Sequence, residues 1–104
     1  SILMKNYDSY TPINGDYSFG TKDGVYYLVE LKTGEKVALE GVDKAFPLSV
    51  KNEDTNSTEL ALVVRKDQAW YMIDTKGETI YTFEQTELTE NSKLTLKDNK
   101  LQVE

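Results

Sequence analysis

The chain contains neither cysteine nor histidine. Without cysteine, a disulfide framework and a thiolate metal site are excluded, while the compartment stays open because a chain of this length can fold through its core alone. Without histidine, the usual general base near neutral pH is missing, and the usual nucleophile pairs of hydrolytic enzymes are missing with it. We therefore expect no enzymatic activity and no cofactor.

Long apolar runs are also missing. No run approaches the roughly 20 residues that span a bilayer, and Ser1-Ile2-Leu3-Met4 is too short for the core of a signal peptide. We therefore expect no direct insertion into a membrane. The chain starts at Ser rather than Met and ends at Glu104 inside an alternating stretch, which favours a processed or excised piece of a longer protein.

Basic residues are fewer than acidic ones. The 12 basic and 18 acidic residues give a formal net charge of −6. The field of such a chain opposes binding to phosphate backbones and anionic lipids, so nucleic acid is not an expected partner. An acidic surface could instead block a basic site, as an inhibitor or immunity-type protein does, although ordinary domains carry this much charge to stay dispersed.

What the chain does contain is a repeated pattern. The stretch Lys22 to Val37, KDGVYYLVELKTGEKV, returns as KDQAWYMIDTKGETI from Lys66 to Ile80. Each partner of Asp23 to Glu30 is displaced by the same step, before one extra residue in the first copy brings Gly34 onto Gly77. A period of this size is typical of β-repeats. We expect one β domain over residues 1–104, with repeat units at about 17–50 and about 60–90 and a possible degenerate hairpin at 93–104.

The periodic segments alternate with period two, and none carries an apolar stripe at helical spacing. Val25 to Leu31, Leu60 to Val64 and Trp70 to Ile73 are apolar on both faces, which predicts central strands. Residues that tolerate positive φ separate the strand candidates, as tight hairpin turns require. We expect an all-β fold of about seven to nine short antiparallel strands, as a sandwich, a small barrel or blade-like sheets.

One polar tract invites a metal-site hypothesis. Lys51 to Thr58, KNEDTNST, has no apolar residue and is predicted to be a solvated loop. Within it Asn52, Asp54 and Asn56 alternate as oxygen ligands do at the start of a calcium-binding loop. Ser57 occupies the position where such a loop needs Gly, and the closing carboxylate is missing. A solvated insertion is therefore favoured over a metal site.

Seven tyrosines dominate the aromatic residues. Their flat rings and polar tips suit stacking on sugars or peptides, but the same properties suit cross-strand packing. Positions repeated in both copies, such as Tyr26 and Trp70, are predicted to build the core. Tyr7, Tyr10 and Tyr17 lie outside the matching segments and are the candidates for an exposed ligand-binding patch.

The second copy resembles a known family, the bacterial tryptophan-glycine repeat. In LALVVRKDQAWYMIDTKGETI, the positions typical of that repeat are Trp70, Ile73, Asp74, Gly77 and Ile80. The Gly that follows the Trp in the family is Tyr71 here. The resemblance covers roughly 17–83 as two units.

The resemblance implies β-repeat modules in bacterial proteins, mostly without catalysis, that serve as interaction or envelope-associated units. We therefore expect a protein-interaction or scaffold module within a larger or partnered bacterial protein, with a protein partner and with an oligomer as a further option. A carbohydrate or small-ligand binding domain and the acidic inhibitor are the alternatives.

Overall fold

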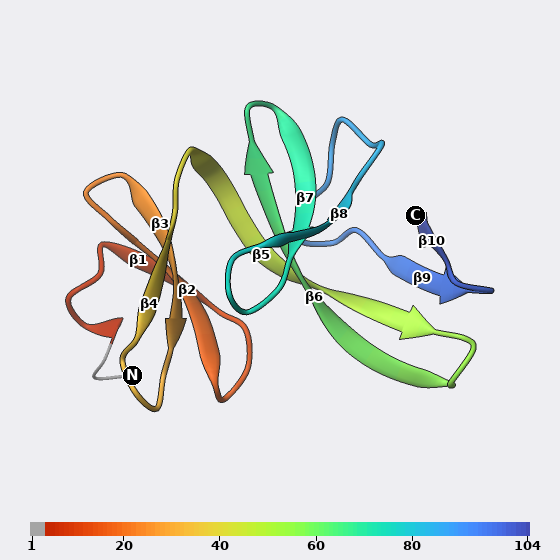
Figure 1. The fold of residues 1–104 in the computed structure, drawn as a ribbon, viewed down its shortest axis with the longest axis horizontal. Coiled ribbons are helices and arrows are strands. Elements are labelled where there is room, and N and C mark those ends of the chain that lie inside the picture. Colours follow the sequence, from red (N-terminus) through yellow and green to blue (C-terminus); the bar gives the residue numbers. More distant parts are fainter. Residues whose placement is uncertain (1–3) are drawn as a thin grey trace.

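The computed structural model describes residues 4–104, which form an all-β structure of two sheets (Figure 1). The first sheet is an antiparallel meander in the order β1-β2-β3-β4, with β1 at Ser9–Pro12, β2 at Tyr17–Lys22, β3 at Val25–Glu30 and β4 at Lys36–Leu39. The second sheet has the order β10-β9-β5-β6-β7-β8. Its strands are β5 at Val42–Asn52, β6 at Ser57–Lys66, β7 at Ala69–Ile73, β8 at Thr79–Thr82, β9 at Leu94–Lys97 and β10 at Lys100–Val103.

The all-β prediction is confirmed, and two of its details were wrong. The described residues contain ten strands, one more than the upper bound expected. All eight neighbouring strand pairs would be antiparallel in the predicted scheme, whereas β5 and β9 pair in parallel. The parallel pair arises because the chain between β8 and β9 crosses over the sheet before it reaches β5, and only a crossover can join strands in parallel.

The polar tract Lys51 to Thr58 is half strand and half turn, so the predicted loop is shorter than expected. Lys51 pairs with Thr58 and Asn52 with Ser57, so β5 and β6 form a long hairpin and only residues 53–56 make the turn. A polar sequence can extend a strand where the sheet projects into solvent, because the ladder hydrogen bonds need no apolar side chains.

Three hairpins share one turn chemistry. The central residues Asp23-Gly24, Asp67-Gln68 and Asp98-Asn99 all have positive φ, between 50° and 80°. Positive φ at both central residues is the type I′ geometry that matches the twist of two-residue hairpins. The corresponding meanders β2-β3-β4 and β6-β7-β8 nevertheless lie in different sheets. The two-unit organisation with its bounds remains a prediction.

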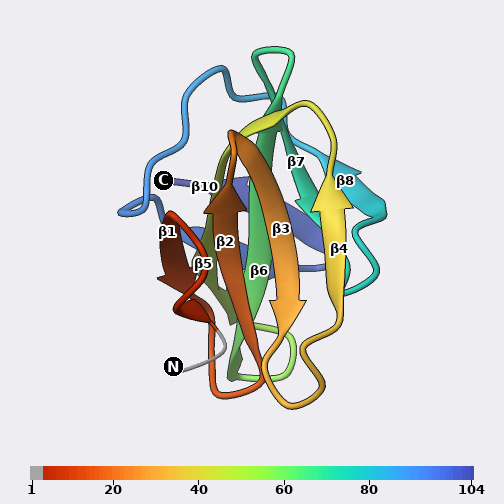
Figure 2. The ribbon, with the colours of Figure 1, turned by 90° about the vertical axis from the view of Figure 1, so that its left-hand side faces the viewer.

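The two sheets pack face to face. In Figure 2 the first sheet lies in front of β5 and β6. The buried residues between the sheets are Phe19, Leu28 and Leu39 from the first and Ala45, Leu62, Val64 and Ile73 from the second. A second core lies on the opposite face of the six-stranded sheet, with Phe46, Leu48, Val50, Ala61, Val63, Trp70, Phe83, Leu88 and Leu94. The six-stranded sheet is therefore covered on both faces along part of its length.

The N-terminal segment covers the outer face of the first sheet. Met4 is buried, and the ring of Tyr7 lies edge-on to Tyr27 with centroids 6.0 Å apart. A Cβ on Gly20 would lie 2.7 Å from both Met4 Cε and Tyr7 Cδ2. Only glycine therefore lets the segment approach the sheet this closely.

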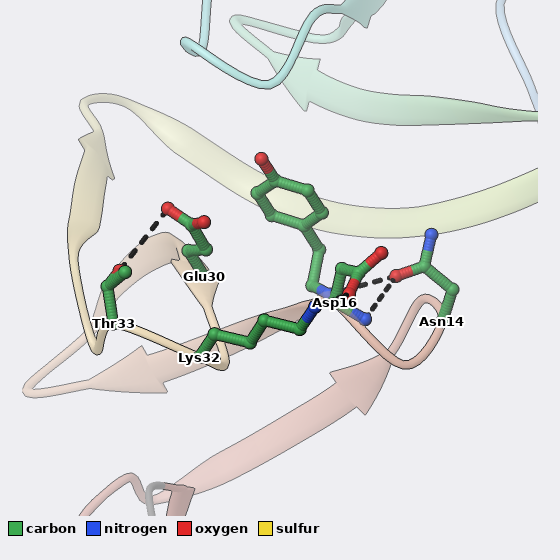
Figure 3. Close-up of polar contacts among 6 residues, drawn as sticks. Asn14, Asp16, Glu30, Lys32 and Thr33 are labelled. Atoms are coloured by element: carbon green, nitrogen blue, oxygen red, sulfur yellow. Dashed lines mark hydrogen bonds and ion pairs between the residues drawn. The ribbon is translucent and has the colours of Figure 1, made fainter.

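A polar cluster fixes one end of the first sheet, where two turns meet (Figure 3). Asn14 Oδ1 accepts hydrogen bonds from the backbone N–H groups of Asp16 and Tyr17, which sets the β1–β2 turn. The Lys32 ammonium lies 3.7 Å from the Asp16 carboxylate. These exposed contacts stabilise the two turns. Along residues 4–104, no helix is long and apolar enough to cross a membrane.

A candidate binding groove on the six-stranded sheet

An apolar hollow of about 380 Å³ opens on the face of the six-stranded sheet that points away from the first sheet. It is an extension of the second core, because its walls include Met72, Leu96 and Leu101, which pack against that core. We call this hollow the groove. Its lining residues are Val50, Glu59, Leu60, Ala61, Met72, Ile80, Tyr81, Leu96, Asn99 and Leu101.

Strand register explains why these side chains meet. Met72 pairs with Tyr81 and Leu96 with Leu101, and directly paired residues project from the same face of a sheet. The register shifts between Met72 and Ile73, which makes Ile80 an extra residue in β8. A bulge of this kind re-aims the side chain beside it. It brings Ile80 next to Tyr81 at the groove, where strict alternation would separate them.

The groove collects three of the four large exposed apolar side chains of residues 4–104. Among residues 4–104 the large exposed apolar side chains are Tyr10, Leu60, Ile80 and Tyr81, and all except Tyr10 line the groove. Ile80 is 59% exposed. Scattered single apolar residues are ordinary on a surface, whereas a contiguous patch marks a site of interaction.

One end of the same face is closed by well-packed aromatics. Trp70 is 1% exposed, and its ring lies 5.5 Å from Phe46. The indole N–H of Trp70 donates to the carbonyl of Thr86, which anchors the segment between β8 and β9 over the sheet. Tyr81 lies edge-on to Phe83 at 5.0 Å, so the exposed ring continues directly from the buried core.

The predicted metal ligands lie beside the groove and make hydrogen bonds within the protein. Asp54 accepts hydrogen bonds from the backbone N–H groups of Asp98 and Asn99, and so fixes the β9–β10 turn. Asn52 donates to the Glu59 carboxylate at 3.1 Å. Asn56 accepts from the Lys51 ammonium at 2.9 Å. Asp54 thus holds the β5–β6 turn against the β9–β10 hairpin, whereas Asn52 and Asn56 make hydrogen bonds within the β5–β6 hairpin. The cation hypothesis stays a prediction.

Asn52 also shapes the turn itself. Its Oδ1 accepts hydrogen bonds from the backbone N–H groups of Asp54 and Thr55, an Asx turn. Within residues 4–104, no group of three or more carboxylates lies close enough to hold a metal ion.

The three predicted ligand-binding tyrosines do not form one patch. Tyr10 pairs with Gly20, and Gly20 pairs with Tyr27, so Tyr10 and Tyr27 share the outer face of the first sheet with Tyr7. Tyr17 packs instead against the core between the sheets. Only Tyr10 is well exposed, at 52%. Burial raises the pKa of Tyr7, and the neighbouring Tyr27 adds to the rise.

Two further hollows flank the contact between the sheets. One of about 500 Å³ is lined in part by Glu40, Lys66 and Asp67, and one of about 450 Å³ in part by Lys44 and Glu90. Both are larger than the groove, but their linings carry charges of both signs and none of the large exposed apolar side chains. Because burial of apolar surface drives most association, the groove is the stronger candidate.

The groove residues were missed by the reasoning from sequence. A signal was present in Glu78-Thr79-Ile80-Tyr81-Thr82, where two adjacent apolar residues interrupt the alternation that a regular strand would show. Such a break is the mark of a bulge or of a strand with both faces apolar. Comparison of the chain with protein-family models, with curated proteins and with solved structures gave no match.

Proposed function

We propose that the chain is a non-catalytic protein-interaction module that binds its partner at the groove. The observation that supports this most directly is that Leu60, Ile80 and Tyr81, three exposed apolar side chains, line one apolar hollow. Exposed apolar residues cost solubility, and a surface retains them in one patch where a partner covers them. The resemblance to the tryptophan-glycine repeat supports a place in a larger or partnered bacterial protein.

The chemistry of the groove supports binding rather than catalysis. Its polar side-chain groups are those of Glu59 and Asn99 and the hydroxyl of Tyr81, and Glu59 already accepts a hydrogen bond from Asn52. A general acid or base is usually one of a pair of titratable groups whose environments separate their pKa values. The groove offers an apolar wall with one carboxylate at its rim, which suits recognition of an apolar segment.

The test uses two charge substitutions at equally exposed sites. We expect Ile80→Glu to abolish capture of the proteins that the wild-type chain retains from bacterial lysate and envelope fractions, because it places a charge in the apolar hollow. Tyr10→Glu, on the other sheet, is the matched control and should retain them. Unchanged circular dichroism of both variants would show that the fold is intact. Equal capture by both variants, or turnover of any substrate by the chain, would contradict the proposal.

A specific observation also favours the carbohydrate alternative. Tyr10, Tyr27 and Tyr7 share the outer face of the first sheet, and the Lys36 ammonium lies 4.9 Å above the Tyr27 ring. Aromatic rings in one row can stack on sugar rings. If this face is the site, a glycan array should give binding that Tyr10→Ala removes and Ile80→Glu leaves unchanged.

A further inference from the structure

The strand that borders the groove is itself unpaired along one side. Within residues 4–104, β8 forms an edge of the six-stranded sheet and pairs with β7 alone. All four of its residues are exposed. An edge strand presents a row of free backbone N–H and C=O groups, which is a template for another strand.

The other edge strands carry features that discourage such pairing. β1 ends in Pro12, and β4 and β10 begin with Lys36 and Lys100. Proline and lysine are the residues with which natural sheets protect their edges. Between Thr79 and Thr82, β8 has neither, and it offers two threonines around Ile80 and Tyr81, all residues that favour strands. Its bulge is the one protective feature it has.

Charge defines the chemistry of the strand that would fit. Glu78 and Glu84 stand immediately before β8 and shortly after it, and Glu59 lies at the rim of the groove. Glu78 and Glu84 are exposed, and neither takes part in the ion pairs found within residues 4–104. An added strand therefore meets a carboxylate at each end, whether it runs parallel or antiparallel to β8.

We infer that the occupant of the groove is an extended segment of a partner protein that adds to β8 as a strand, with alternating apolar residues between basic ends. This inference rests on the proposed function and names the partner segment. Main-chain hydrogen bonds to β8 would hold the segment, and its apolar side chains on one face would enter the groove beside Ile80 and Tyr81.

A second copy of the chain is a poorer occupant. Pairing of β8 with β8 of another molecule around a two-fold axis opposes glutamates to glutamates at the strand ends, in either strand direction. Like charges directly opposite are destabilising in a sheet. A net charge of −6 on each molecule adds to this repulsion.

The test uses a defined peptide, acetyl-Lys-Val-Thr-Val-Thr-Val-Lys-amide, and the isotope-labelled chain. We expect saturable shifts of the amide signals of Thr79 to Phe83 and of the groove residues, with slower amide exchange in β8. The same peptide with Glu at both ends should bind about fivefold more weakly or worse, because two exposed ion pairs are lost, and the difference should shrink as salt rises.

Charge reversal gives the sharpest control. In Glu78→Lys with Glu84→Lys, the preference should invert in favour of the Glu-ended peptide. Glu35→Lys with Glu40→Lys changes the same number of charges around β4 and should leave the preference as it is. A preference that follows this control pair, or shifts confined to β4, would overturn the assignment to β8.

Backbone methylation separates strand addition from simple filling of the groove. N-methyl groups on the second, fourth and sixth peptide residues, or on the third and fifth, block opposite edges of an extended peptide, so one of the two versions should lose binding. If both bind equally, or if the unmodified peptide does not bind, strand addition is wrong.

A doubled mass by light scattering with the same β8 shifts would identify a second copy instead. Each of these failures leaves the Ile80→Glu capture result standing, so failure of the inference and failure of the proposed function are distinguishable.

Discussion

The two meanders β2-β3-β4 and β6-β7-β8 begin alike and end differently. Both open with the same positive-φ hairpin turn after a lysine. Their third strands diverge, because Val37 in β4 packs against the core between the sheets, whereas its counterpart in the sequence, Ile80 in β8, is exposed. The same pattern of residues thus places Val37 of β4 against the core and leaves Ile80 of β8 exposed to solvent.

Corresponding faces of the two meanders also point in opposite directions, one toward the other sheet and one away from it. Tyr26 and Leu28 point toward the other sheet, while their counterparts Trp70 and Met72 point away from it. The face of the first meander is closed by β5, β6 and β7, and that of the second only by a crossing segment and a short hairpin. The groove exists where that shorter cover stops. Local sequence makes the meander, and what packs against it decides which parts stay open.

The largest expected effect on stability comes from replacing Trp70, and we compare it with Tyr26, its counterpart in the first meander. Trp70→Ala should lower the free energy of unfolding by about 3–5 kcal/mol, because a fully buried indole is replaced by a cavity. Tyr26→Ala should cost clearly less, since Tyr26 is only partly buried. Urea unfolding followed by circular dichroism measures both. Equal losses would show that the two faces are closed to the same degree.

The next effect concerns the cover on the outer face of the first sheet. Gly20→Ala should destabilise the fold by about 1–3 kcal/mol, the usual cost of overpacking, because its Cβ collides with Met4 and Tyr7. Gly15→Ala is the matched control, since a Cβ there meets nothing within 4 Å. Faster amide exchange around Tyr7 in Gly20→Ala alone would locate the damage. An unchanged unfolding midpoint would show that the segment is not held against Gly20.

A third test addresses the divergent strands directly. Val37→Asp buries a charge against the core between the sheets and should cost about 2 kcal/mol or more. Ile80→Asp changes an exposed side chain and should stay within about 0.5 kcal/mol. Thermal unfolding of the two variants gives the comparison. A large loss in Ile80→Asp would mean that β8 is a structural strand and that the groove is part of the core.

Much of the fold could be predicted from local patterns, because the signals are local. Alternation located the central strands, and Asp-Gly and Asp-Asn located hairpin turns that the structure bears out. The solvated loop predicted for Lys51 to Thr58 is confirmed only at residues 53–56, because polarity alone was taken as a loop signal and the β5–β6 ladder extends into both ends of the tract. The parallel β5–β9 pair depends on contacts distant in sequence.

The candidate site was harder to predict than the fold. Tyr7, Tyr10 and Tyr17 were grouped because they lie outside the matching segments, but the strands place them on two faces of one sheet. The groove draws Met72 and Ile80 from the adjacent strands β7 and β8, and Leu101 from β10, which joins this sheet only after the crossover. No local pattern specifies which apolar residues remain uncovered once the segments have packed.

The smallest expected effect is a pH dependence confined to the first sheet. Burial, and secondarily the neighbouring Tyr27, raise the pKa of Tyr7 above its ordinary value of 10.0 in the folded state. The folded chain therefore holds that proton more tightly than the unfolded chain does. The stability this contributes is present below about pH 10 and is lost as the pH rises through the folded pKa.

Urea unfolding between about pH 9 and about pH 11 should show a decline in stability that is shallower in Tyr7→Phe than in the wild type. In Tyr27→Phe the slope should fall by a smaller amount, because that variant removes only the neighbour's charge. Ile80→Asp, on the other sheet, should follow the wild-type slope. If Tyr7→Phe also follows the wild-type slope, the tyrosine is not buried against the sheet as described, and the contrast between a covered first sheet and an open second sheet loses one of its supports.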